Sequence, residues 1–206
     1  MDPVMKILFA FVISLYVFAG TLSAVPIPFD LRDRSTTAEI VSGAITRGGV
    51  TATLTPIVSG STGALNQTAS AFGINASTSD DDTDTLDGGA GAESISLLFN
   101  TDIVFTQLGL SLLSAGESAS LTIDGFASIP LSDTGVGSDI FSYASNNLVL
   151  TGQTVLLSWI GGNGFSFDNF TIDTDVPPTT VPESGTTLAF LGLGVFGLIL
   201  FRRFRC

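Results

Sequence analysis

The feature that most restricts the fold of this chain is a repeated two-residue alternation of apolar and polar side chains. Segment 93–100 (ESISLLFN) places Ile95, Leu97 and Phe99 on one face and serines on the other, and segment 118–126 alternates in the same way. A period of two is the spacing of a β-strand with one buried face. Five further runs carry strand signals: 50–58, 102–113, 147–151, 154–160 and 165–173.

Turn-forming residues separate these runs, as in 114–117 (SAGE), 133–135 (DTG) and 161–164 (GGNG). Glycine supplies positive φ angles at such places, and asparagine and aspartate tolerate them. Between the two chain ends, no stretch shows the period of an amphipathic helix. Many short strands with frequent turns predict an all-β domain, an antiparallel β-sandwich with a jelly-roll-like arrangement.

The last run, 165–173, breaks the alternation. Phe165 and Phe167 share one face, whereas Phe170 and Ile172 fall on the opposite parity. Either this strand is buried on both faces, or a bulge at Asp168–Asn169 resets the alternation.

Both ends of the chain are apolar. Near the N-terminus, Lys6 precedes a mostly apolar core at 7–18, and small residues follow at 19–24. This pattern predicts a secretory signal peptide over 1–24, with an uncleaved anchor helix as the alternative.

At the C-terminus, an apolar run of sixteen residues spans 186–201, and Arg202, Arg203 and Arg205 follow it. As a helix the run would measure roughly 24 Å, short of the ~30 Å hydrocarbon core. Arginine side chains that reach to the interface can close this gap. We therefore expect a transmembrane helix over 186–201 with a basic cytoplasmic tail at 202–206, which leaves the bulk of the protein outside.

A short motif precedes this run: Val181, Pro182, Glu183, Ser184 and Gly185. Together with the apolar run and the basic end, it resembles the exosortase sorting signals of Gram-negative bacteria, the PEP-CTERM class and its VPDSG-CTERM relative. The Ser184–Gly185 pair favours the VPDSG form, in which aspartate is usual at position 183. The resemblance implies an exported protein that an exosortase-type enzyme processes. An ordinary single-pass anchor is the alternative, and the LPXTG sortase signal is a poorer match.

The charge of the chain excludes nucleic acid as a partner. The formal net charge is −12, and no lysine or arginine occurs from residue 48 to residue 201. Loss of both ends removes four positive charges and one negative charge, so the exported part carries about −15. Nucleic-acid binding needs a basic surface.

Residues that common catalytic sites require are absent. The chain has no histidine, and its one cysteine, Cys206, and one lysine, Lys6, both lie outside the predicted domain. Ser-His-Asp, Cys-His and Ser-Lys sites and ordinary zinc sites are therefore excluded there. A carboxylate pair of the glycosidase type stays open. The single tryptophan, Trp159, is expected in the core or at the edge of the sandwich rather than on a sugar-binding surface. We expect a protein that is not an enzyme.

An acidic segment is the candidate metal site. Asp80, Asp82, Asp84 and Asp87 lie in a stretch that ends in two glycines, and Ca²⁺ prefers such oxygen ligands. The segment is not an EF-hand, and a solvated loop is the alternative. The sequence GFSFDNFTID resembles the last strand of exported domains that precede a PEP-CTERM tail, and in similar calcium-bearing jelly rolls a closing-strand aspartate binds an ion. This resemblance implies Asp168 as a further ligand.

The sequence thus predicts five parts: a signal peptide (1–24), a β-sandwich domain (25–175), a linker with the sorting motif (176–185), a transmembrane helix (186–201) and a basic tail (202–206). The preferred function is a non-catalytic envelope or extracellular-matrix protein associated with exopolysaccharide, held in the inner membrane before processing. A calcium-stabilised carbohydrate-binding or adhesive module, and a polysaccharide-active enzyme without recognisable motifs, are the alternatives.

Overall fold

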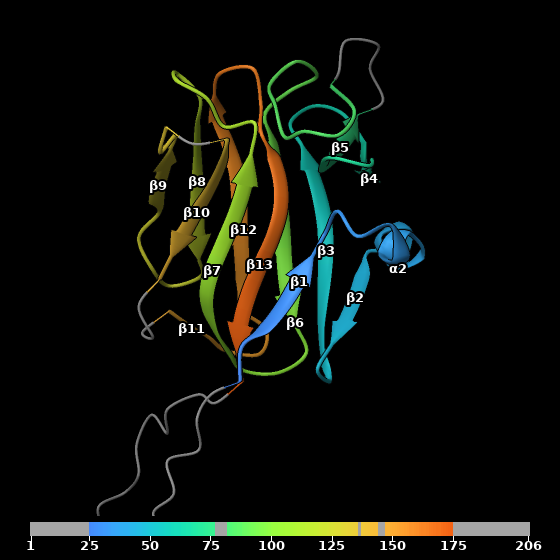
Figure 1. Ribbon diagram of the computed structural model, residues 1–206, viewed down its shortest axis with the longest axis vertical. Coiled ribbons are helices and arrows are strands. Elements are labelled where there is room, and N and C mark those ends of the chain that lie inside the picture. Colours follow the sequence, from blue (N-terminus) through green and yellow to red (C-terminus); the bar gives the residue numbers. More distant parts are fainter. Residues whose placement is uncertain (1–24, 77–81, 136, 144–146, 175–206) are drawn as a thin grey trace, which may run out of the picture. The chain divides into compact units, whose positions relative to one another are not determined.

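The computed structural model describes residues 25–76, 82–135, 137–143 and 147–174, and these residues form an antiparallel β structure with one short α-helix (Figure 1). The predicted signal peptide, sorting motif, transmembrane helix and basic tail lie outside the described residues, as does Asp80. Within the described ranges, no helix is long and apolar enough to cross a membrane. The strands are β1 (Ile27–Asp30), β2 (Ala44–Arg47), β3 (Val50–Val58), β4 (Gly63–Gln67), β5 (Phe72–Ala76), β6 (Glu93–Phe99), β7 (Ile103–Ser111), β8 (Ser118–Ile123), β9 (Ile129–Ser132), β10 (Ser138–Ser142), β11 (Leu148–Val149), β12 (Thr154–Gly161) and β13 (Ser166–Asp173).

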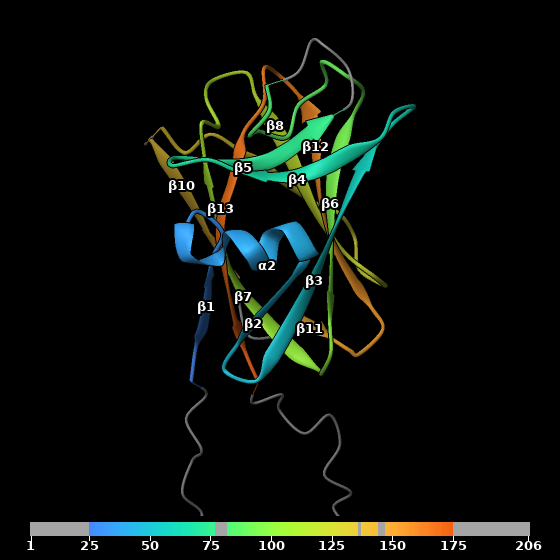
Figure 2. The same cartoon turned by 90° about the vertical axis from the view of Figure 1, so that its right-hand side faces the viewer.

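Two sheets face each other and form the body of the domain (Figures 1 and 2). The first sheet has the strand order β1-β13-β7-β10, with β11 also paired to β7. The second sheet has the order β2-β3-β6-β12-β8-β9, and the hairpin of β4 and β5 stands apart from both. All the strand pairs are antiparallel. The predicted antiparallel sandwich is confirmed at this level.

Phenylalanine rings dominate the core between the sheets. Phe170 of β13 stacks on Phe29 of β1 with ring centroids 4.5 Å apart. It also meets Phe105, Phe99 and Phe167 at 5.9, 6.0 and 5.8 Å. Because such ring pairs add to the free energy gained from burial alone, Phe170 joins both sheets at the centre of the fold.

The irregular last strand contains the predicted bulge. Phe167 pairs with Leu110, but the next pair in the ladder joins Asn169 to Gly109, so Asp168 is the extra residue. The inserted residue puts Phe167 and Phe170 on the same buried face despite their odd spacing. The bulge at Asp168 is confirmed; in the first half of the strand both faces are also buried, since Ser166 and Asp168 are 0% and 1% exposed.

A short helical segment closes one side of the sandwich. A 3-10 turn, η1 (Arg34–Thr36), leads into α2 (Thr37–Ser42), and α2 lies beside the β4–β5 hairpin across the space between the sheets (Figure 2). Ile40 is the buried residue of α2 and joins the hydrophobic core. The expectation that the domain contains no helix was wrong, because six residues are too few to show a 3.6-residue period.

The chain enters and leaves the sandwich at the same end. Ile27 of β1 pairs with Ile172 of β13, so the first and last strands lie side by side (Figure 1). At the opposite end lie the turns after β3, β7, β9 and β12 and the acidic segment. The end where β1 begins and β13 ends therefore carries the connections to the rest of the chain. The opposite end carries acidic loops.

Candidate functional site

Backbone hydrogen bonds hold the described part of the acidic segment against the sandwich. The amide of Leu86 donates to the carbonyl of Phe165 at 2.7 Å, and the amide of Phe165 donates back at 3.1 Å. The amide of Ile74 in β5 donates to the carbonyl of Thr85 at 3.0 Å. Because these bonds reach both β5 and the start of β13, residues 85 and 86 behave as a short added strand rather than as a free loop.

The carboxylates of this segment point to separate partners. Asp82 is exposed, and Asp84 accepts a hydrogen bond from Thr68 Oγ1 at 2.7 Å. Asp87 is only 4% exposed and accepts from the Gly89 amide at 2.7 Å, while its own amide donates to Glu93 Oε2 at 3.1 Å. Among the described residues, no group of three or more acidic, histidine or cysteine side chains is arranged to hold a metal ion. Calcium binding here therefore stays a prediction from the sequence, and one of its ligands, Asp80, lies outside the described ranges.

Asp168 belongs to a different network, on the outer side of the first sheet. Its Oδ2 lies 2.9 Å from Arg32 Nη1, and its Oδ1 accepts from Ser111 Oγ at 2.8 Å and from Ser166 Oγ at 3.0 Å. The residue is 1% exposed. Burial raises the pKa of this carboxyl, against the opposing effects of the Ser111 hydroxyl and the Arg32 guanidinium. The charge that Asp168 meets in the structure is a guanidinium, so its contacts describe a buried structural pair.

The Arg32 network was missed at the sequence level. Arg32 and Asp168 lie at opposite ends of the domain sequence, and no local spacing relates them. Only the pairing of β1 with β13 brings them together, since Leu31 donates its amide to the Asp168 carbonyl at 2.9 Å. The one available signal was the placement of all three domain arginines near its start, which does not identify their partners.

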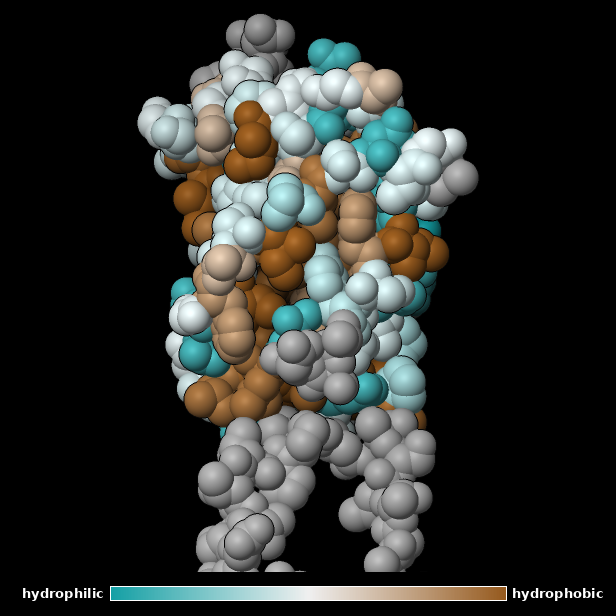
Figure 3. Space-filling view, turned by 90° about the vertical axis from the view of Figure 1, so that its left-hand side faces the viewer, coloured by the Kyte–Doolittle hydropathy of each residue, from teal (hydrophilic) through white to brown (hydrophobic). Residues whose placement is uncertain are grey.

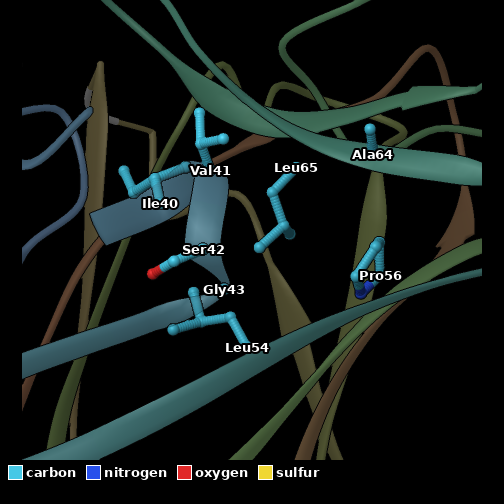
Figure 4. A pocket seen from close by; sticks show the side chains of 8 residues that line it. All are labelled: Ile40, Val41, Ser42, Gly43, Leu54, Pro56, Ala64 and Leu65. Atoms are coloured by element: carbon cyan, nitrogen blue, oxygen red, sulfur yellow. The ribbon is translucent and has the colours of Figure 1, made fainter. Parts of the chain in front are cut away.

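An apolar hollow of about 440 Å³ lies between α2, β3 and β4 (Figure 4). Its wall contains no titratable side chain, so the hollow offers no group for acid–base chemistry. The lining residues are Ile40, Val41, Ser42, Gly43, Leu54, Pro56, Ala64 and Leu65.

The tryptophan and the domain's tyrosine serve the core. Trp159 packs against the buried cluster, and a Cβ on Gly88 would lie 2.4 Å from its ring, so loop backbone covers it. Trp159 is therefore partly buried at the margin of the core. Tyr143 packs against Phe105 with ring centroids 5.9 Å apart, and burial raises its pKa. Neither ring therefore forms an open platform for a sugar.

Comparison with known families assigns the tail and leaves the domain unassigned. Residues 180–205 match the family model described as the VPDSG-CTERM motif, a PEP-CTERM-like exosortase sorting signal. The match covers the motif residues 181–185 together with Arg202, Arg203 and Arg205, and it confirms the resemblance recognised in the sequence. No curated protein and no solved structure matches this chain. The sorting signal points to an exported protein.

Proposed function

We propose that this chain is a non-catalytic protein of the cell envelope or extracellular matrix, delivered there by an exosortase-type enzyme. The observation that carries the proposal is the match of residues 180–205 to a sorting signal. This signal follows the β domain in the sequence. Residues 1–24 would direct export, and residues 186–201 would hold the precursor in the inner membrane until the motif is processed. Association with exopolysaccharide is part of this proposal.

The chemistry of the domain supports a non-catalytic role. The sequence supplies no histidine, and the domain no lysine or cysteine. The buried carboxylate of Asp168 is paired with an arginine and two hydroxyls, and the hollow beside α2 is lined by uncharged residues. These arrangements stabilise a fold, and none of them presents an activated nucleophile beside a base.

The proposal extends to the fold, which we assign to the jelly rolls. Eight strands in chain order are β1, β6, β7, β8, β9, β10, β12 and β13. Numbered one to eight, they form one sheet in the order 1-8-3-6 and a facing sheet in the order 2-7-4-5. This connectivity is that of two interlocked Greek keys, with β2 to β5 as an insertion after the first strand.

The test is the intact mass of the mature protein from its native host. A C-terminus between Val181 and Gly185 is expected, with or without an attached group, whereas a product that retains Cys206 contradicts the proposal. A Pro182→Ala variant should accumulate as the unprocessed precursor in the membrane fraction. Pro178→Ala, which makes the same change just outside the matched residues, is the control and should be processed normally.

A further inference from the structure

Within its strands, the outer face of the second sheet carries no charged side chain; at its margin, Asp124 in the turn after β8 accepts a hydrogen bond from Thr154 Oγ1 at 2.8 Å. Along each strand of this sheet, inward apolar residues alternate with outward ones, and the outward positions hold only serine, threonine and aliphatic residues. The outward set is Ala44, Thr46, Thr51, Thr53, Thr55, Ile57, Ser94, Ser96, Leu98, Ser118, Ser120, Thr122, Pro130, Ser132, Thr154, Leu156, Ser158 and Ile160. We call this set the neutral face.

Strand register arranges the neutral face in rows that cross the sheet. One row runs Thr55, Ser96, Leu156 and Thr122 through β3, β6, β12 and β8. The next runs Ile57, Ser94, Ser158, Ser120 and Pro130. Only part of this hydroxyl surface is used internally, as where Ser94 Oγ donates to Ser158 Oγ at 2.9 Å. Each serine or threonine hydroxyl can donate or accept a hydrogen bond, so the hydroxyls of one neutral face can bond to those of an identical face.

Aliphatic side chains are exposed within these rows. Ile57 is 46% exposed, Leu98 39% and Ile160 58%. Ile160 points outward at the irregular end of β12, where the register with β8 shifts between Trp159 and Gly161. Covering such side chains removes apolar surface from water and so favours association.

The charge of the domain directs contacts between copies to this face. Residues 25–175 contain 17 acidic side chains and three arginines, a net charge of −14, so two copies repel each other wherever their carboxylates approach. The outer side of the first sheet holds Asp30 and Asp173, and the loop end holds the acidic segment. The neutral face is the extended surface on which two acidic copies can meet with little repulsion.

The strand edges are unsuited to pairing with another copy. β1 and β9 are four residues long and contain Pro28 and Pro130, which donate no backbone hydrogen bond. β10 turns the buried carboxylate of Asp139 inward, and β2 is four residues long and ends at Arg47. Proline, inward charge and short length are the devices that suppress edge-to-edge addition. Face-to-face stacking is therefore the open route.

The size of the neutral face sets the strength of such a contact. Six strands about 4.8 Å apart and roughly six residues long give an area on the order of 500 Å². Standard interfaces bury about 800 Å² per partner, and smaller ones are weak and transient. Twisted sheets stack with their strands within about 30° of each other, as do the two sheets inside a sandwich.

From these observations we infer that a second copy of this chain packs on the neutral face, forming a reversible, two-fold symmetric dimer between the second sheets of two molecules. Identical faces meet in such a dimer, so residues near the centre, such as Ser96 of β6, approach their own counterparts. The inference does not depend on the route by which the protein is exported.

The test is sedimentation of the full-length chain in detergent over a hundredfold concentration range. The wild type should pass from monomer to dimer, and Ser96→Glu should weaken dimerisation at least tenfold because it places two carboxylates in the contact. Ser142→Glu adds the same charge at an exposed position of β10 in the other sheet and should leave dimerisation unchanged. Thr55→Glu, at an exposed position of β3, replaces Ser96→Glu if that variant does not fold.

A cysteine pair provides the second readout. In a Cys206→Ser background, Ser96→Cys should give covalent dimers with a short bifunctional maleimide, and Ser142→Cys should stay monomeric. Three results overturn the inference: a monomer at every concentration, dimerisation that survives a folded Ser96→Glu or Thr55→Glu variant, or cross-linking only through Ser142→Cys. A further result would also overturn the inference: a protein that stays monomeric and binds a neutral glucan, such as insoluble cellulose, with the binding lost in Ser96→Glu. The neutral face would then be a glycan-binding surface.

Discussion

Arg32 Nη1 lies 2.9 Å from Asp168 Oδ2, and this pair ties the segment after the first strand to the bulge of the last strand. The Arg32 side chain is 35% exposed, whereas that of Asp168 is 2% exposed. Removing the arginine therefore leaves a buried carboxylate without its countercharge.

Arg32→Ala should lower the free energy of unfolding by about 1–3 kcal/mol, which is below the full cost of breaking a buried pair because solvent reaches the arginine. Urea denaturation measures the effect. Arg34→Ala, two residues along the chain at an exposed position, is the control and should change the free energy by less than about 0.5 kcal/mol. The Arg32→Ala/Asp168→Asn double variant should recover part of the loss, and no recovery would show that the charge of Asp168 is not the cause.

The pH dependence of stability should change when Asp168 is neutralised. Burial raises the pKa of this carboxyl above its ordinary value of 3.8, so the folded state binds the proton more tightly than the unfolded state. Its contribution to stability is therefore present below pH 3.8 and is lost as pH rises through the folded pKa. Relative to the wild type, Asp168→Asn should gain stability across that window. Melting curves from pH 3 to pH 7 measure the difference, and a flat difference would refute the assignment.

The pKa of Asp102 should be lowered, whereas that of Asp168 is raised. The amide and hydroxyl of Thr151 both donate to its Oδ1 at 2.7 Å, and these bonds lower the pKa of the carboxyl. This contribution is present above pH 3.8 and is lost as pH falls through the folded pKa. Carbon-detected NMR titration should find the Asp102 pKa below 3.8, and Thr151→Val, which removes the hydroxyl donor, should raise it. An unchanged pKa in that variant would assign the shift to the amide alone.

Gly73 should not tolerate a side chain. A Cβ at this position of β5 would lie 2.4 Å from the backbone of Thr85, where the acidic segment adds to the hairpin. Gly73→Ala should therefore destabilise the domain by about 1–3 kcal/mol, the usual cost of overpacking. Gly137→Ala is the matched control, since a Cβ there meets nothing within 4 Å. Equal melting temperatures for the two variants would contradict the close packing of the acidic segment.

Phe170 should be the most costly aromatic side chain to remove. It is fully buried among four other phenylalanine rings, so Phe170→Ala should cost about 3–5 kcal/mol. Phe126, which is 51% exposed, is the control, and Phe126→Ala should cost less than about 0.5 kcal/mol. Denaturant midpoints of the two variants measure the contrast.

The strands with one buried face were the predictable part of the fold. Runs 50–58 and 93–100 match β3 and β6 to within one residue, because alternation is strict where one face is solvated. Run 118–126 ends earlier, at Ile123, where the chain turns, and run 147–151 reduces to the two residues of β11. The position of the bulge could also be predicted from the sequence, because Phe167 and Phe170 are both apolar and can share the buried face only if one extra residue lies between them.

The short elements could not be predicted from the sequence. β1, β2, β9 and β10 have only four or five residues, and β10 carries Asp139 where alternation would call for an apolar side chain. Their pairing depends on partners far along the chain. The same limit applied to the candidate site: Asp168 was recognised as special, but its partner Arg32 becomes visible only when β1 pairs with β13.

The pairing of the first strand with the last also limits when the domain can fold during the export that we propose. A chain that crosses the membrane from its N-terminus delivers β1 long before β13, so Phe29 cannot reach Phe170 until nearly the whole domain has emerged. Loop closure over this separation makes the final step slow relative to local hairpins. Strand β13 ends at Asp173, only eight residues before Val181. In the export route that we propose, the sandwich could therefore close only when residues just before the sorting motif have emerged.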